Sequence, residues 1–181
     1  YSVAKTDKYR LTIRSNPSSS IVVCWNQISG EDPIVYYGKD DEGIQFKKYK
    51  YNHKADRVVL HHGMNNHFAR LDKLKADTRY YFVIKDSEGT SERFWFKTAP
   101  SKNDKLSFLA GGDSRNNRLP RQHANLLVSK LKPHAVLFGG DMTARDIAVQ
   151  WKDWMDDWQL TTSKDGRMIP IIATRGNHER A

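Results

Sequence analysis

The sequence predicts a protein in two parts: an N-terminal all-β sandwich, then the first β-α-β-α-β part of an α/β domain. Two observations carry this prediction. The first hundred residues contain about seven short runs of β-branched and aromatic residues, separated by turn residues. After residue 104, short apolar runs alternate with stretches whose apolar residues repeat at helical spacing. With 181 residues, 38% of them hydrophobic, the chain is long enough for one or two domains with a buried core.

The predicted sandwich strands follow one another at the spacing typical of that architecture. Residues 10–14 alternate polar and apolar side chains, and residues 16–20 have the composition of a turn. Residues 21–25 are β-branched and end in Trp25, which we expect, like Trp95, in the sandwich core. The remaining predicted strands cover residues 33–38, 57–60, 66–71, 80–84 and 92–98.

A short stretch late in the predicted sandwich resembles fibronectin type III domains. Leu74, Thr78 and Tyr80 keep the spacing of the L-x-P-x-T-x-Y stretch of that family, with Ala76 in place of the proline. The resemblance implies that the tyrosine bonds back to the upstream backbone and fixes the corner of the sandwich. We place the boundary at residue 100, so that residues 1–100 form a fibronectin III-like sandwich and residues 101–181 the α/β part.

The second part alternates three predicted strands with two predicted helices. Strands are expected at residues 105–110, 134–138 and 168–173. The first helix, at residues 120–132, has apolar residues at positions 124, 127, 128 and 131, and the second repeats the stripe at positions 147, 151, 154, 155 and 158. This alternation predicts right-handed crossovers and a parallel sheet covered by helices.

Charge and composition narrow the possible partners. The net charge is +9, and the excess is spread over 17 basic and 12 acidic side chains in residues 1–100 and 13 and 9 in the remainder. Such a distribution favours a general attraction for anionic ligands and no specific nucleic-acid partner. No apolar run approaches the ~18 residues of a membrane span, and the single Cys24 excludes an intrachain disulfide.

Three polar motifs come directly after the three predicted strands of the second part. They are Gly-Gly-Asp113, Gly-Gly-Asp141 and Gly-Asn177-His178. One such motif alone is more often a turn or a helix cap than a ligand. Because parallel strands end at the same edge of a sheet, however, the four polar side chains should meet at one rim. Oxygen donors from several loops predict a site for hard or borderline cations there.

In these motifs the sequence resembles the calcineurin-like metallophosphoesterases, and with the sandwich ahead of them it is most similar to the purple acid phosphatase type. The resemblance implies two metal ions among Fe, Zn and Mn, with Asp141 bridging both, Asp113 holding one and Asn177 the other. His178 would lie beside the substrate and assist the leaving group. The expected activity is hydrolysis of phosphate monoesters on small molecules or phosphoproteins. An extracellular or periplasmic location is a further expectation from the family.

The sequence departs from the family pattern in three places. Arg115 follows the first motif, where many relatives have histidine and purple enzymes glycine; it is either a contact for substrate phosphate or an ordinary surface arginine. Ala144 stands where purple enzymes have the metal-binding tyrosine that gives their colour, so we expect no purple colour. The family's downstream Gly-His-x-His segment would lie after Ala181, and we expect the polypeptide to continue there.

Two other groups of residues have the composition of a binding site. His61, His62 and His67 could form a separate metal cluster, but neighbours on a strand point to opposite faces, which argues against it. The tryptophans at 151, 154 and 158 could stack on a ligand, but their spacing favours packing of the helix on the sheet. Two other functions remain open: a phosphodiesterase or nuclease of the same superfamily, or a binding or adhesion protein with a decayed metal site.

Overall fold

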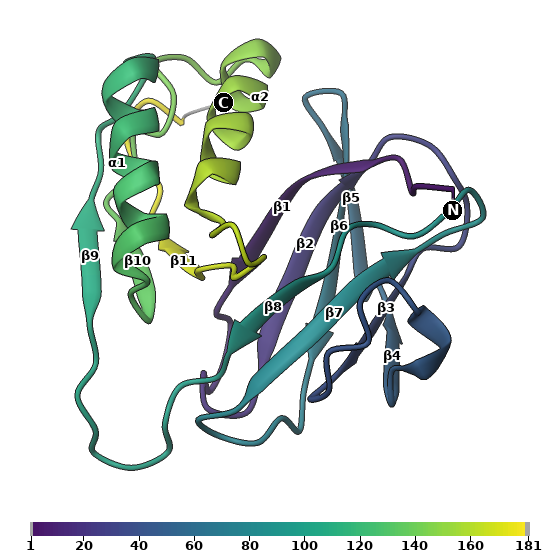
Figure 1. The fold of residues 1–181 in the computed structure, drawn as a ribbon. Helices are drawn as coiled ribbons and strands as arrows, with labels where there is room; N and C mark the ends of the chain where they lie inside the picture. The colour runs from purple at the N-terminus through teal and green to yellow at the C-terminus, as the bar shows by residue number, and fades with distance from the viewer. Residues whose placement is uncertain (1, 180–181) are drawn as a thin grey trace.

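A computed structural model describes residues 2–179, and both predicted parts are present in it (Figure 1). The first part contains strands β1 (Thr6–Thr12), β2 (Ile21–Gln27), β3 (Ile34–Gly38), β4 (Tyr51–Lys54), β5 (Arg57–His61), β6 (Met64–Leu71), β7 (Arg79–Lys85) and β8 (Phe94–Lys97), with a short 3-10 helix η1 (Phe46–Lys48). The second contains β9 (Phe108–Gly111), α1 (Arg118–Leu131), β10 (Ala135–Phe138), α2 (Ala148–Trp158), the 3-10 helix η2 (Gln159–Thr161) and β11 (Ile171–Ala173). The predicted fold class is confirmed.

The first part is an antiparallel sandwich whose core lies between two sheets. One sheet has the order β4-β3-β7-β8, and the facing layer is formed by β5, β6, β2 and β1. The largest side chains without solvent exposure in this core include Trp25, Phe82 and Phe96, so the expectation for Trp25 is confirmed. An additional strand, β4, was not predicted from the sequence, because its polar residues show no apolar alternation.

Trp95 is buried, but it does not belong to the sandwich core. The guanidinium groups of Arg79 and Arg167 pack on its ring, with their central carbons 5.1 and 5.3 Å from the ring centroid. Its backbone bonds Gly166 and Met168, on the segment that leads into β11. The expectation for Trp95 is therefore wrong: Trp95 is buried because the second part of the chain covers it.

Tyr80 forms the corner that the fibronectin-like stretch predicted. Its hydroxyl accepts a hydrogen bond of 2.9 Å from the backbone N–H of Lys75, five residues upstream. The Tyr80 ring is buried against Phe96, with the two ring centroids 5.8 Å apart. Ala76, in place of the usual proline, leaves this contact intact.

The second part has a parallel three-stranded sheet in the order β9-β10-β11, with both helices packed on it. A second core contains Val136 and Ile171 from the strands, Val128 from α1, and Trp154 and Trp158 from α2. The packing interpretation of the tryptophan stripe holds for Trp154 and Trp158. It is wrong for Trp151, which lines a cavity outside this core.

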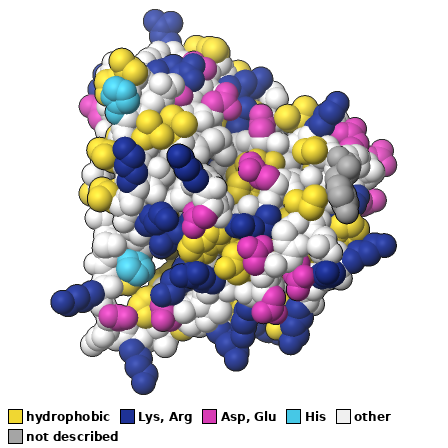
Figure 2. Space-filling view, in the orientation of Figure 1, with side chains coloured by type: hydrophobic (Ala, Val, Ile, Leu, Met, Phe, Trp, Pro, Cys, Tyr) yellow, Lys and Arg dark blue, Asp and Glu magenta, His cyan; other side chains and the backbone are white. Residues whose placement is uncertain are grey.

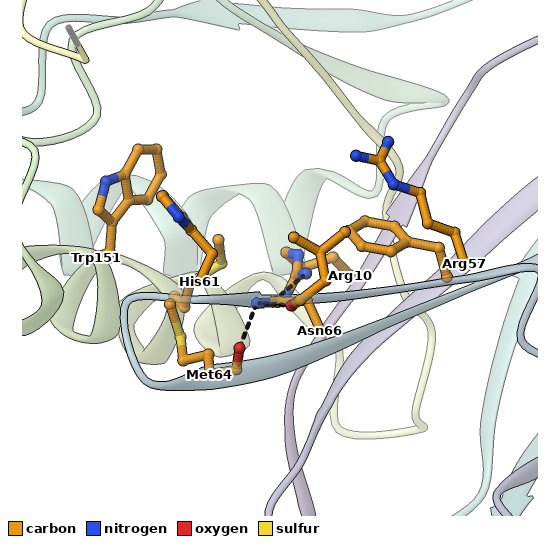
Figure 3. Close-up of a pocket in the computed structure, with 9 residues that line it drawn as sticks. Arg10, Arg57, His61, Met64, Asn66 and Trp151 are labelled. Carbon is orange, nitrogen blue, oxygen red and sulfur yellow. Dashed lines mark hydrogen bonds between the residues drawn. The ribbon is translucent and has the colours of Figure 1, made fainter. Parts of the chain in front are cut away.

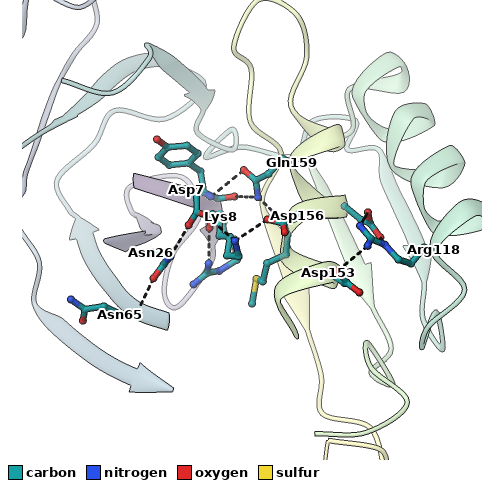
Figure 4. A network of polar contacts seen from close by, with 12 residues as sticks. Asp7, Lys8, Asn26, Asn65, Arg118, Asp153, Asp156 and Gln159 are labelled. Atoms are coloured by element: carbon teal, nitrogen blue, oxygen red, sulfur yellow. Dashed lines mark hydrogen bonds and ion pairs between the residues drawn. The ribbon is translucent and has the colours of Figure 1, made fainter. Parts of the chain in front are cut away.

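The two parts share one sheet, because β1 pairs in parallel with β11 through Thr12 and Ile171. The larger sheet therefore has seven strands in the order β5-β6-β2-β1-β11-β10-β9. Beyond this pair, the side-chain amide of Gln159 bonds both the N–H and the C=O of Tyr9 on β1, at 3.1 and 3.2 Å. Lys8 forms an ion pair of 2.9 Å with Asp156 of α2 beside it (Figure 4).

Basic and acidic side chains are interspersed over the face of the molecule shown in Figure 2, in agreement with the even spread of charge along the chain. Within residues 2–179, no helix has both the length and the apolar character that crossing a bilayer requires.

Candidate functional site

The three motifs lie in loops at one edge of the parallel sheet. Phe138, the last residue of β10, is in register with Gly111 at the end of β9 and with Ala173 at the end of β11. Asp113, Asp141 and Asn177 follow these strand ends by two, three and four residues. The sheet register therefore brings the three loops to one rim, as the strand alternation predicted.

Backbone hydrogen bonds fix the first loop on the second. The N–H of Asp113 donates to the carbonyl of Gly140 at 2.8 Å, and the N–H of Arg115 donates to the carbonyl of Asp141 at 2.9 Å. Asp113 and Asp141 both have left-handed backbones, with φ of 50° and 53°. Such φ values are uncommon outside glycine, so these bonds hold both aspartates in conformations that the chain would otherwise avoid.

The second and third loops touch so closely that Gly176 has no room for a side chain. A Cβ atom there would lie 1.9 Å from Oδ1 of Asp141, well inside van der Waals contact. Glycine is needed at this position because the backbone itself packs against the aspartate carboxylate.

Glu179 is a structural centre of the site that the sequence reasoning missed. Its buried carboxylate accepts three backbone N–H groups: those of Asp141 at 2.9 Å, Gly176 at 2.8 Å and Thr143 at 3.1 Å. One side chain thus ties the third motif to the second. The sequence shows an acidic residue after His178, but no local pattern reveals that two of its three partners lie 36 and 38 positions earlier.

Asp141 and His178 are in direct contact. Oδ1 of Asp141 accepts the backbone N–H of His178 at 3.0 Å, and the Asp141 side chain is 13% exposed. Nδ1 of His178 lies 2.9 Å from the carbonyl oxygen of Ala144. Because a carbonyl can only accept, Nδ1 carries the proton in this bond. Nε2 is then the ring atom of His178 that can exchange a proton or a hydrogen bond with another molecule.

Arg115 lies between the two aspartates. Its Nε donates to Oδ1 of Asp113 at 2.6 Å, and its Nη2 is 3.8 Å from Oδ2 of Asp141. Asp113 is the more exposed carboxylate, with 65% of its side chain accessible, against 13% for Asp141. The positive charge of Arg115 therefore partly neutralises the two carboxylates, those of Asp113 and Asp141.

Asn177 is exposed on the third loop. Within the described part of the chain, its side chain makes no hydrogen bond with either aspartate. The structure thus brings Asp113, Arg115, Asp141 and His178 into a connected group and leaves Asn177 on the same rim without a direct contact.

The oxygen donors fit a cation site. Oδ1 of Asp141 accepts the His178 backbone N–H, whereas among residues 2–179 Oδ2 has only the long contact with Arg115. The rim thus holds an incompletely bonded carboxylate oxygen, an exposed carboxylate and an exposed amide, all hard donors. Asp113, Asp141 and Asn177 are therefore the residues of this rim that could hold metal.

Side chains of helices α1 and α2 hold the first loop in place through hydrogen bonds. Trp154 of α2 donates through Nε1 to Oγ of Ser114 at 3.2 Å, and a guanidinium nitrogen of Arg121 in α1 donates to the carbonyl of Arg115. Arg121 is itself paired with buried Asp157 of α2, at 2.5 Å. The site thus rests on an ion pair between the two helices.

Asp157 accepts hydrogen bonds from three side chains of α1, those of Arg118, Arg121 and Gln122. Burial alone would raise the pKa of Asp157, but the hydrogen bonds, with the charge of Arg121, outweigh it and hold that pKa below its ordinary value. The carboxylate is therefore ionised in the folded protein at neutral pH.

Comparison with known families divides the chain in the same way as the fold. Residues 6–98 match the family described as purple acid phosphatase, N-terminal domain, and residues 112–181 match calcineurin-like phosphoesterase. The first match alone covers half of the chain.

Individual relatives agree with these matches. The chain is 27% identical to the phosphoenolpyruvate phosphatase of Allium cepa, over 88% of the chain and 34% of the relative. It is 30% identical to the Fe(3+)-Zn(2+) purple acid phosphatase 12 of Arabidopsis thaliana, over 62% of the chain and 25% of that protein. The chain thus spans about a third or less of the length of these curated relatives.

Two solved structures share the fold. Purple acid phosphatase PPD1 from yellow lupin (Lupinus luteus) seeds superposes with a TM-score of 0.76 at 15% identity, covering 98% of this chain and 36% of that one. The structure of PhoD gives a TM-score of 0.67 at 14% identity, covering 93% and 38%. Both likenesses extend over the sandwich and the α/β part together.

Proposed function

Since the chain belongs to the calcineurin-like phosphoesterases, with the N-terminal domain of the purple acid phosphatases ahead of the phosphoesterase segment, we propose that the whole protein is a metal-dependent phosphatase that hydrolyses phosphate monoesters. The observation that carries the proposal is the connected group of Asp113, Arg115, Asp141 and His178 at the edge of the parallel sheet.

In this proposal two metal ions, among Fe, Zn and Mn, are held in part by residues of this chain. Asp141 would hold both ions, Asp113 one of them and Asn177 the other. When bound, the ions supply an activated water and neutralise charge on the phosphate. The relative named an Fe(3+)-Zn(2+) enzyme supports a centre with two metals.

His178 and Arg115 are the proposed catalytic residues of this chain. The bond from His178 Nδ1–H to the Ala144 carbonyl fixes the ring. In the cationic ring, protonated on both nitrogens, Nε2 donates its proton to the leaving oxygen of the ester. Arg115 pairs with carboxylates on the rim, and its guanidinium can bind two phosphate oxygens in a fork when metal ions take over those carboxylates. We expect Arg115→Ala to raise KM more than it lowers kcat.

The proposed substrates are phosphorylated small molecules or phosphoproteins. Phosphoenolpyruvate is a reasonable first substrate to test, because a 27% identical relative bears that name. We also propose an extracellular or periplasmic location, in keeping with the purple acid phosphatase N-terminal domain.

The test uses the full-length protein loaded with Zn²⁺, Mn²⁺ or iron. Hydrolysis of p-nitrophenyl phosphate well above that of bis-p-nitrophenyl phosphate supports the proposal. The reverse preference indicates a phosphodiesterase or nuclease of the same superfamily. No hydrolysis of either compound by metal-loaded protein indicates a binding or adhesion protein with a decayed metal site.

Two substitutions separate the roles of the site residues. We expect Asp141→Ala to lose bound metal, because Asp141 is proposed to touch both ions. His178→Ala should keep the metal and lower kcat by about 100-fold or more, the usual contribution of a general acid. Metal analysis of both purified variants beside their kinetics checks this. Metal loss in the His178 variant with none in the Asp141 variant would reverse the two assignments.

A further inference from the structure

The hairpin between β5 and β6 places two neighbouring histidines on the same side. His61 pairs with Met64 across the hairpin, so that His62 and Gly63 form a two-residue turn with φ of 52° and 68°. Strand alternation ends at His61, and the rings of His61 and His62 lie with their centroids 3.9 Å apart. The expectation that these neighbours point to opposite faces is therefore wrong. His67 is elsewhere, stacked on Trp25.

Asp146 meets this pair from the other part of the chain. It lies five residues after Asp141, in the loop before α2. Its Oδ1 accepts hydrogen bonds from Nε2 of His62 at 2.8 Å and from Nε1 of Trp151 at 2.7 Å. The His62 and Asp146 side chains are only 18% and 17% exposed. The carboxylate is thus held in place beside the hairpin.

One ring nitrogen from each histidine and one carboxylate oxygen all lie within 4.8 Å of one another. Among residues 2–179, no other three His, Cys, Asp or Glu side chains come this close. We propose that His61, His62 and Asp146 bind a divalent metal ion of the Zn²⁺ type, with water as the fourth ligand. Two imidazoles and a carboxylate are a donor set that suits Zn²⁺ and Co²⁺.

The three side chains need to move only slightly to bind the ion. Bonds of roughly 2.0–2.1 Å in a tetrahedron put neighbouring ligand atoms about 3.3 Å apart. His62 Nε2 and Asp146 Oδ1 must therefore separate by about half an ångström as the metal replaces the proton between them. His61 is exposed, and within the described residues its ring nitrogens have no hydrogen-bond partner, so its ring can turn inward without losing a bond.

A cavity of about 340 Å³ beside the cluster gives this ring room to turn. His61 and Trp151 lie at one end of it, and Arg10, Asn66 and Arg57 line the rest (Figure 3). The ion would cross-link the sandwich hairpin to the loop that carries Asp141 and Ala144. It is a second site, and nothing in the proposed phosphatase chemistry requires it.

The test measures Zn²⁺ binding to full-length protein by equilibrium dialysis after removal of bound metal. His61→Ala is the most informative variant, because within residues 2–179 the ring of His61 makes no hydrogen bond that the substitution would remove. We expect it to bind one equivalent of Zn²⁺ fewer than the wild type, or to bind that equivalent at least tenfold more weakly. Asp146→Asn should do the same, whereas Asp141→Ala should keep this ion even if it loses those of the proposed phosphatase centre.

The matched control is His53→Ala. His53 also faces a carboxylate, that of Asp56 at 3.0 Å, but within the described part of the chain no third metal-binding side chain joins that pair. It should bind Zn²⁺ as the wild type does. Thermal melts add a second readout: Zn²⁺ should raise the Tm of the wild type more than that of His61→Ala, while the metal-free Tm values agree. Unchanged Zn²⁺ stoichiometry and affinity in both His61→Ala and Asp146→Asn would overturn the proposal.

Discussion

Glu179 shows how much of the candidate site depends on one side chain that contacts the predicted ligand Asp141 only through its backbone. Its carboxylate accepts the backbone N–H groups of Asp141, Gly176 and Thr143 and is almost completely buried. A buried carboxylate is costly unless its oxygens are well bonded, and here three donors meet that need. The loops around Asp141 are therefore held by an acidic residue of the neighbouring motif.

The Glu179→Gln variant tests this role. The substitution replaces one carboxylate oxygen, an acceptor, by an NH₂ group, which is a donor and would face a backbone N–H. We therefore expect the free energy of unfolding to fall by about 2 kcal/mol. Urea denaturation of the metal-free protein measures it. Glu88→Gln is the matched control, because Glu88 is exposed and, among the described residues, its carboxylate accepts a hydrogen bond from the Ser29 hydroxyl alone. Equal stability of the two variants would show that Glu179 does not hold the loops.

At the scale of elements, helices α1 and α2 are joined by the contacts of Asp157 with Arg118 and Arg121. Asp157 and Arg121 are both buried, and Arg121 also bonds the carbonyl of Arg115 in the first motif. The ion pair thus fixes the first motif relative to the two helices. Removing one partner would leave the other charge buried without compensation, which is strongly destabilising.

We expect Asp157→Asn to lower the free energy of unfolding at pH 7 by about 3 kcal/mol. Asp153→Asn is the control, since Asp153 pairs with the same Arg118 at a more exposed position and should change stability by less than about 0.5 kcal/mol. Urea titrations of both variants beside the wild type check the difference. Similar losses in the two variants would contradict the buried pair as the source of stability.

The same aspartate predicts an acid dependence. The pKa of Asp157 is lower in the folded protein than its ordinary value of 3.8, so the unfolded chain takes up the proton first as the pH falls. The stabilisation is therefore complete above about pH 4 and is lost as the pH decreases through the folded pKa. Unfolding free energies measured between pH 6 and 2 should fall less steeply in Asp157→Asn than in the wild type.

Local patterns were sufficient to predict most elements and the edge where the motifs meet. The stripe through Trp154 and Trp158 indicated α2 because its period matches the face packed on the sheet. The positions of Asp113 and Asp141 followed from the rule that parallel strands end together. Helix α1 begins at Arg118 instead of residue 120, since proline is tolerated in a first helical turn.

Contacts between distant segments could not be predicted from such patterns. The role of Glu179 depends on backbone groups of another loop, and the burial of Trp95 depends on Gly166 and Arg167. The position of His62 depends on a two-residue turn that interrupts strand alternation, and nothing in residues 61–64 excludes a longer loop. In each case the decisive partner is set by tertiary packing and not by local periodicity.

For the whole molecule, the amide of Gln159 acts as an extension of the sheet, because it bonds both backbone groups of Tyr9 on β1. Gln159→Ala leaves these two groups without that partner, and we expect it to lower the unfolding free energy by about 1–2 kcal/mol. Because one sheet runs through both parts, thermal unfolding should remain a single cooperative transition in the wild type. Calorimetry measures both the unfolding free energy and the number of melting transitions.

Gln45→Ala serves as the control, since Gln45 is an exposed residue beside η1, far along the chain from β1. It should change stability by less than about 0.5 kcal/mol. Two resolved melting transitions in the wild type, with Gln159→Ala affecting neither, would show that the two parts unfold independently.

The pairing of β1 with β11 also sets an order of events during synthesis. Residues 6–98 can leave the ribosome and close their sandwich while Ile171 has yet to be made, since Thr12 and Ile171 are 159 positions apart. At a translation rate of roughly 5–20 residues per second, the Thr12 end of β1 stays unpaired on that side for several seconds. Such an open edge is a template for unwanted strand pairing. Nascent chains stalled before residue 159 should therefore self-associate more readily than chains released after β11, because the earlier chains lack both Gln159 and Ile171 to cover the edge.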